Sequence, residues 1–100
     1  MHKVRITRTA SDDLDSIQAY GLAEFGARST FAFMEGFDRI FARLASYPLA
    51  DAAAPHYGRA VRSCLHSPYR VLYRYESGVV SIQRVIHTAQ RTRPIEDTWE

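Results

Sequence analysis

The sequence predicts an α+β fold with the order β-α-α-β-β-β, in which an antiparallel sheet packs on an N-terminal helical hairpin. Apolar side chains recur at helical spacing over residues 9–47 and alternate as in β-strands over residues 59–87. The chain has 100 residues, of which 46% are hydrophobic and 24% charged. These values predict one globular domain, residues 1–100, with a modest core.

A short strand and a helix should form the N-terminal part. Residues 2–7 alternate, with Val4 and Ile6 on one side of the expected strand. Thr9 has the sequence context of a helix N-cap, because acidic residues follow in the first turn, where the helix dipole favours negative charge. Gly26 should close this helix.

A second helix should run from about Arg28 to Tyr47, where Pro48 stops it. Its length and the short link before it favour an antiparallel helical hairpin. Gly36 inside the helix costs about 1 kcal/mol relative to alanine. We therefore expect another backbone, that of the first helix, to approach closely at Gly36.

Three strands should follow an Ala- and Pro-rich loop, at Arg59 to Leu65, Tyr69 to Glu76 and Val79 to His87. Alternation gives the middle strand one face of aromatic and β-branched residues and one face that carries arginines. The first face comprises Tyr69, Val71, Tyr73 and Tyr75; the second comprises Arg70, Leu72 and Arg74. We expect this antiparallel meander to pack one face on the helices and to leave the other partly open.

Charge is distributed unevenly. Residues 1–56 hold six basic and seven acidic residues, whereas residues 59–93 hold seven arginines and a single acid, Glu76. A basic β-rich half points to an acidic partner, either nucleic acid or an acidic polypeptide. The single cysteine, Cys64, and the lack of an apolar leader or membrane-length segment predict a cytoplasmic protein without disulfides.

Several motifs, in this order, resemble the ParE/RelE superfamily of type II toxin–antitoxin toxins, and its ParE (plasmid stabilisation) branch in particular. They cover nearly the whole chain: residues 9–17 with Tyr20, residues 41–48, 58–62, 69–74 and 82–87. The resemblance implies a toxin neutralised by a cognate ParD-like antitoxin with an acidic C-terminal tail, in a hetero-oligomer. ParE-like members are associated with poisoning of DNA gyrase, and RelE-like members cut mRNA on the ribosome.

The residues present in this chain favour poisoning of DNA gyrase over cleavage of mRNA. In the RelE-like resemblance an arginine at the position of Arg70 contacts the RNA phosphate, but arginine cannot serve as a base. RelE-like enzymes also carry lysines on the strand equivalent to residues 59–65 and a C-terminal tyrosine. Here Lys3 is the only lysine, and no tyrosine follows Tyr75. If the chain were nevertheless an RNase, its site would comprise Arg62, Arg70, Arg84 and His87.

Two further sets of residues are candidates for binding proteins. The resemblance and the enrichment of Arg and Trp in binding hot spots suggest a target-binding set of Arg70, Arg74, Arg91, Arg93 and Trp99. Apolar positions that the expected core does not use, together with nearby arginines, suggest an antitoxin-binding set of Leu22, Phe31, Arg59, Arg62, Leu72 and Ile82. Trp99 could instead seal the core. No spacing suggests a metal or cofactor site, and a non-toxic member that only binds its antitoxin remains an alternative.

Overall fold

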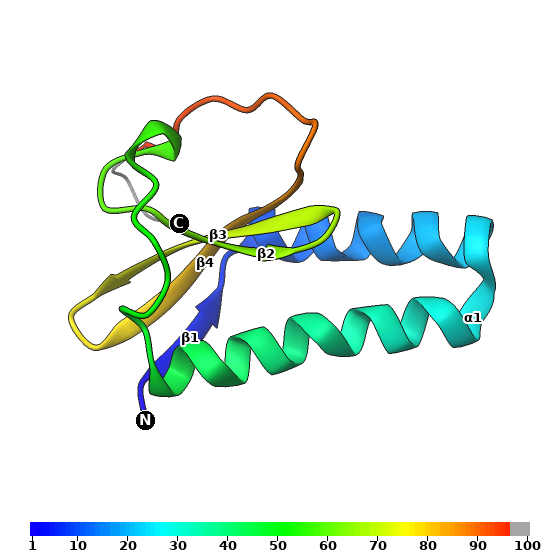
Figure 1. The fold of residues 1–100 in the computed structure, drawn as a ribbon, viewed down its shortest axis with the longest axis horizontal. Coiled ribbons are helices and arrows are strands. Elements are labelled where there is room, and N and C mark those ends of the chain that lie inside the picture. Colours follow the sequence, from blue (N-terminus) through cyan, green and yellow to red (C-terminus); the bar gives the residue numbers. More distant parts are fainter. Residues whose placement is uncertain (97–100) are drawn as a thin grey trace.

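The computed structural model describes residues 1–96 (Figure 1). Its elements are β1 (Lys3–Ile6), α1 (Arg8–Ser46), the 3-10 helix η1 (Pro55–Tyr57), β2 (Arg62–His66), β3 (Tyr69–Glu76) and β4 (Val79–His87). Gly26 breaks α1 into two antiparallel segments, so the predicted α+β fold with the order β-α-α-β-β-β is confirmed. No helix of the described part is apolar over enough length to cross a membrane.

The four strands form one sheet in the order β1-β4-β3-β2. The expected antiparallel meander is present in β2, β3 and β4, whereas β1 pairs with β4 in parallel, from Lys3 opposite Val79 to Ile6 opposite Ile82. The sheet is therefore mixed rather than wholly antiparallel. A parallel pair needs a long connection between its strands, and the helical hairpin with the β2–β3 hairpin supplies it.

Thr7, and not Thr9, is the N-cap of α1. Its hydroxyl accepts a hydrogen bond from the Ala10 amide at 3.1 Å and donates to the Gln83 carbonyl at 3.2 Å. Its own amide donates to the Ile82 carbonyl at 3.1 Å. The helix begins two residues earlier than the sequence predicts because Thr7 both caps the first turn of α1 and bonds to the middle of β4.

At two glycines of α1 another part of the chain packs closely against the helix backbone, and at Gly36 this neighbour is not the expected one. The helical segments approach each other at Gly21, where an added Cβ would lie 2.8 Å from the Thr30 hydroxyl. At Gly36, an added Cβ would lie 2.4 Å from the ring of His66 in β2, so the prediction that Gly36 faces the first helix is wrong. The His66 ring stacks on Phe33, with centroids 4.2 Å apart, and its Nε2 donates to the Phe33 carbonyl at 2.9 Å.

Each face of the sheet has its own apolar cluster. The helix-side cluster includes Val71 and Tyr73 of β3 and Val80, Ile82 and Val85 of β4. Ile82 and Val85 face the same side despite their odd separation, because a bulge leaves Gln83 without a partner on β3.

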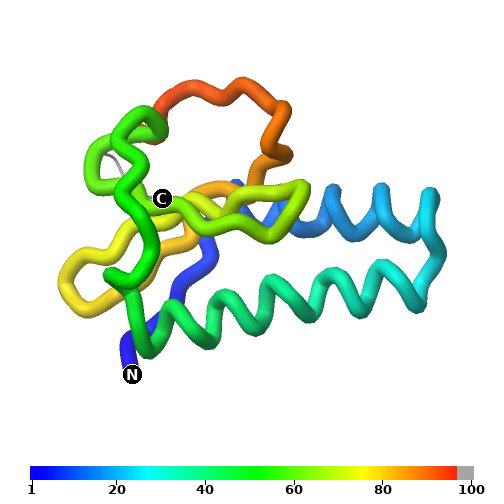
Figure 2. Tube along the Cα trace, in the orientation of Figure 1, coloured from blue at the N-terminus to red at the C-terminus, as the bar shows by residue number. Residues whose placement is uncertain are grey.

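A second cluster, on the opposite face, comprises Val61, Leu72 and Ile86 together with Tyr57 and Ile95. The loop before β2 and the C-terminal segment after β4 supply its cover, and both arch over this face in Figure 2. These segments cover the centre of this face, while its β2 edge stays partly open as expected, with Leu65 55% exposed. Leu72 and Ile82 are fully buried, one in each cluster, so they do not belong to an exposed sheet face.

Replacement of Gly36 by alanine should destabilise the protein by about 1–3 kcal/mol, because the new methyl group displaces the His66 ring. Urea unfolding measures this cost. In a His66→Ala background the same replacement should become neutral or stabilising, since only the better helix propensity of alanine remains. An equal cost in both backgrounds would contradict the contact between Gly36 and His66.

Candidate functional site

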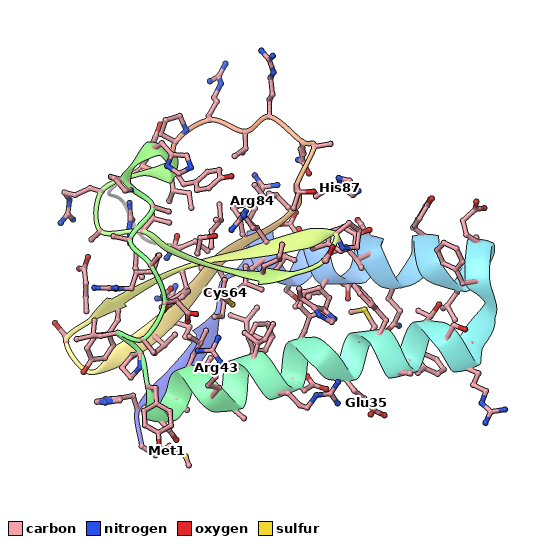
Figure 3. The ribbon with its side chains drawn as sticks, in the orientation of Figure 1. Met1, Glu35, Arg43, Cys64, Arg84 and His87 are labelled. Carbon is pink, nitrogen blue, oxygen red and sulfur yellow. The ribbon has the colours of Figure 1, made fainter. Side chains whose placement is uncertain are left out.

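Arg84 is clamped by a carboxylate from the first helical segment. Its Nε and Nη2 donate to the two carboxylate oxygens of Asp13 at 2.8 and 3.1 Å, and the Val85 amide donates to the same carboxylate at 2.9 Å. The hydrogen bond to Asp13 raises the pKa of Arg84 above its ordinary value. This bidentate pair joins α1 to β4, so the guanidinium group of Arg84 is already paired within the molecule. Figure 3 labels Arg84 on the sheet.

Asp51 organises a second set of internal contacts at the β2 edge. Its carboxylate accepts two hydrogen bonds from Arg43, at 3.0 and 3.2 Å, and one from the Tyr73 hydroxyl at 3.1 Å. Its carbonyl accepts from Arg62 at 2.6 Å. Arg62 therefore holds the loop before β2 in place.

Arg74 is fully buried, so the expectation of an exposed cationic side chain at this position is wrong. Its guanidinium group donates to main-chain carbonyls of Arg59, Ile95 and Glu96. The side chain of Arg59 in turn lies 3.8 Å from a Glu76 carboxylate oxygen, an ion pair too long to be a hydrogen bond.

Arg70 and His87, the remaining members of the conditional RNase set, also have internal contacts. Arg70 is half-buried and donates to the Ser63 hydroxyl at 3.0 Å. His87 is exposed at the end of β4, where its Nδ1 accepts from the Ala89 amide at 3.0 Å and its ring lies edge-on to Tyr69. The conditional RNase set of Arg62, Arg70, Arg84 and His87 thus consists of three arginines, which stay protonated, and one imidazole whose Nδ1 already accepts a hydrogen bond.

Arg91 and Arg93 differ from the other arginines of the β-rich half. Both are exposed, and their guanidinium groups make no hydrogen bond or ion pair within the described residues. They lie on the segment that follows β4 and covers the second cluster. Trp99, the fifth residue of the expected target-binding set, lies outside the described residues.

The turn of the helical hairpin presents apolar surface. Phe31 is 50% exposed and Leu22 is 39% exposed, as expected for docking residues, and Phe25 is 67% exposed. A cavity of about 590 Å³ opens between the two helical segments, the β2–β3 turn and the end of β4. Its lining comprises Ile17, Tyr20, Gly21, Phe25, Ser29, Thr30, Phe33, Pro68, Tyr69 and His87.

The cavity could have been anticipated only in part. Tyr20 fits the helical apolar stripe, which suggests a core residue, yet it is 57% exposed because the hairpin turn projects beyond the sheet. The available sequence signal is the group of aromatic residues on either side of Gly26, namely Tyr20, Phe25 and Phe31.

Cys64 is a packed residue of the helix-side cluster, as its setting in a strand suggests. Burial raises the pKa of its thiol to about 11, so the sulfur stays protonated and poorly nucleophilic at neutral pH. Among residues 1–96, no three His, Cys, Asp or Glu side chains lie together in a way that could hold a metal ion.

Solved structures of toxin–antitoxin systems share this fold, and two of them illustrate the likeness. The chromosomal ParDE toxin–antitoxin system from P. aeruginosa matches with a TM-score of 0.76 and 21% identity, over 87% of this chain and 96% of that chain. The toxin–antitoxin complex RelBE2 from Mycobacterium tuberculosis matches with a TM-score of 0.64 and 23% identity, over 86% and 96%. At such identities the likeness concerns the fold alone.

The sequence itself gives the family. A family model described as the ParE toxin of the type II toxin–antitoxin system parDE matches residues 4–92. The chain belongs to this ParE toxin family, and the predicted ParE/RelE superfamily membership is confirmed. No curated protein matches the sequence closely enough to add to this assignment.

Replacement of Asp13 by asparagine should lower the free energy of unfolding by about 1.5–3 kcal/mol, because Arg84 then loses its charged acceptor. Chemical denaturation gives the measurement. Asp15→Asn is the matched control at an exposed site two residues further on, where the change should stay within about 0.5 kcal/mol. Equal stabilities of the two variants would show that the Asp13–Arg84 pair contributes nothing.

Proposed function

We propose that this ParE-family toxin inhibits DNA gyrase by binding, without chemistry of its own, and that a ParD-like antitoxin neutralises it. The interaction takes place in the cytoplasm. The target is a protein or a protein–DNA complex, and the exposed arginines of the C-terminal segment are its main contacts.

The observation that carries this proposal is the difference between two groups of arginines. Arg84 is paired with Asp13, and Arg62 is bonded to the loop before β2. Cleavage of RNA needs groups that take and give protons, and these arginines can do neither. The guanidinium groups of Arg91 and Arg93 are exposed and unpaired within residues 1–96, and they suit a carboxylate or phosphate group on a partner.

The antitoxin has a separate surface in this proposal. The hairpin turn exposes Leu22, Phe31 and neighbouring aromatic residues beside the cavity. An amphipathic helix of an antitoxin buries such a surface by placing its apolar side chains in the groove. Target contacts and antitoxin contacts then lie on different parts of the toxin.

Expression of the chain without its antitoxin tests the activity directly. Filamentation with a DNA-damage response in cells, together with loss of gyrase supercoiling by the purified protein, is the expected result. Cuts at codon positions in mRNA during translation would instead identify a RelE-like ribonuclease. Normal growth at good expression would identify a non-toxic member that only binds its antitoxin.

The double variant Arg91→Ala/Arg93→Ala should weaken gyrase inhibition by about tenfold or more, the range expected when interface arginines are truncated. A supercoiling assay over a toxin concentration series measures the effect. Arg28→Ala/Arg39→Ala is the matched control, since it removes the same charge from exposed positions on α1. Similar inhibition by both double variants would exclude the C-terminal arginines as specific contacts.

The double variant Leu22→Asp/Phe31→Asp should reduce antitoxin affinity by about tenfold or more, because two exposed apolar contacts become charged. Calorimetry with the antitoxin encoded beside this chain provides the measurement. Ala23→Asp/Ala32→Asp is a control with the same charge change at the adjacent exposed positions. If the control weakens binding as much, the added negative charge on the helical hairpin, and not the loss of this apolar surface, reduces the antitoxin affinity.

A further inference from the structure

Arg74 joins three segments that are distant in sequence. From β3, its Nε donates to the Arg59 carbonyl at 2.9 Å, its Nη1 to the Glu96 carbonyl at 2.8 Å and its Nη2 to the Ile95 carbonyl at 3.2 Å. The side chain is completely buried. A buried guanidinium group is tolerated only where its donors are satisfied, and its rigid planar fork suits several fixed acceptors at once.

A second contact fixes the same end of the C-terminal segment. The Ile95 amide donates to the Tyr57 carbonyl at 2.7 Å, and Ile95 forms a parallel bridge with Gly58. Gly58 has a φ of +136°, and a Cβ added there would lie 2.7 Å from the Ile95 carbonyl oxygen. Only glycine therefore permits this approach without a shift of the backbone. The Ile95 side chain completes the second cluster below it.

A third contact lies nearer to β4. The Nη1 of Arg84 donates to the Thr92 hydroxyl at 3.3 Å, and Arg84 is itself held by Asp13. The segment is thus attached at Thr92 and again at Ile95 and Glu96, and Arg93 lies between these attachments. Arg91 lies one residue before the first of them.

We propose that Arg74 is a positioning residue that clamps the C-terminal segment over the second face of the sheet and so holds Arg91 and Arg93 in a fixed arrangement for the target. The clamp follows from the contacts of Arg74, whereas its effect on a target rests on the proposed function. Fixing both arginines before binding lowers the ordering cost of the complex, so loss of the clamp should weaken target binding even though Arg74 never touches the target.

Two variants test the clamp, one by changing Arg74 and the other by changing the contact of the C-terminal segment with Gly58. Arg74→Lys keeps the charge, but an ammonium group cannot span three carbonyls in the geometry of the guanidinium fork. Gly58→Ala leaves Arg74 intact and pushes Ile95 away. Arg39→Lys, on the exposed face of α1, is the matched control for an arginine-to-lysine change.

Amide hydrogen exchange reports on the clamp without any assumption about function. The Ile95 amide should exchange about tenfold faster or more in both test variants, while paired amides of β3 and β4 keep their wild-type rates. Unchanged exchange at Ile95 in Arg74→Lys would overturn the clamp. If Arg74→Lys does not fold, the same measurement on Arg74→Gln, which keeps an amide donor without the buried charge, decides whether Arg74 is the clamp.

Gyrase inhibition and antitoxin affinity then separate positioning from general stability. Both test variants should lose about tenfold in inhibition and change antitoxin affinity by less than about twofold. Full inhibition by a variant whose Ile95 amide exchanges fast would overturn the positioning role. If the wild-type protein does not inhibit gyrase, the proposed function fails, and the exchange data still decide whether Arg74 clamps the segment.

Discussion

The structure depends on the need to cover a sheet whose two central strands carry apolar side chains on both faces. β3 carries Val71 and Tyr73 on one side and Leu72 on the other, and β4 likewise contributes Ile82 and Ile86 to opposite clusters. Burial of this apolar surface is the main favourable contribution to folding. The helical hairpin covers one face. The loop before β2 and the segment after β4 have to cover the other, since no further helix or strand is available in the described chain.

This second cover explains why several arginines of the β-rich half make hydrogen bonds within the protein. Irregular segments that cross a sheet bring main-chain carbonyls with no partner of their own. Arg62 and Arg74 satisfy several of these carbonyls, and Arg84 ties the same layer to Asp13 of α1. Part of the charge excess that resembles a nucleic-acid surface in the sequence is thus used in internal contacts, whereas the guanidinium groups of Arg91 and Arg93 make no hydrogen bond or ion pair within residues 1–96.

The two binding surfaces of the proposed function belong to different parts of the fold. The C-terminal segment is attached to the sheet and carries Arg91 and Arg93, whereas the hairpin turn extends beyond the sheet (Figure 1). Apolar residues near Gly26 stay uncovered there, because the sheet is too short to reach them. In the proposed function, the charged surface binds the target and the apolar surface binds the antitoxin.

By itself, the sequence determined the elements, the superfamily and the internal position of Cys64, because these depend on local periodicity, turn residues and ordered motifs. The bounds of β3 and β4 agree with the alternation pattern, and Gly26 ends the first helical segment as predicted. Only the tertiary structure decided that β1 runs parallel to β4, that Gly36 faces His66 and that Arg74 is buried. Each of these depends on contacts between residues far apart in sequence, and an alternating strand pattern looks the same whether its polar face meets water or a covering segment.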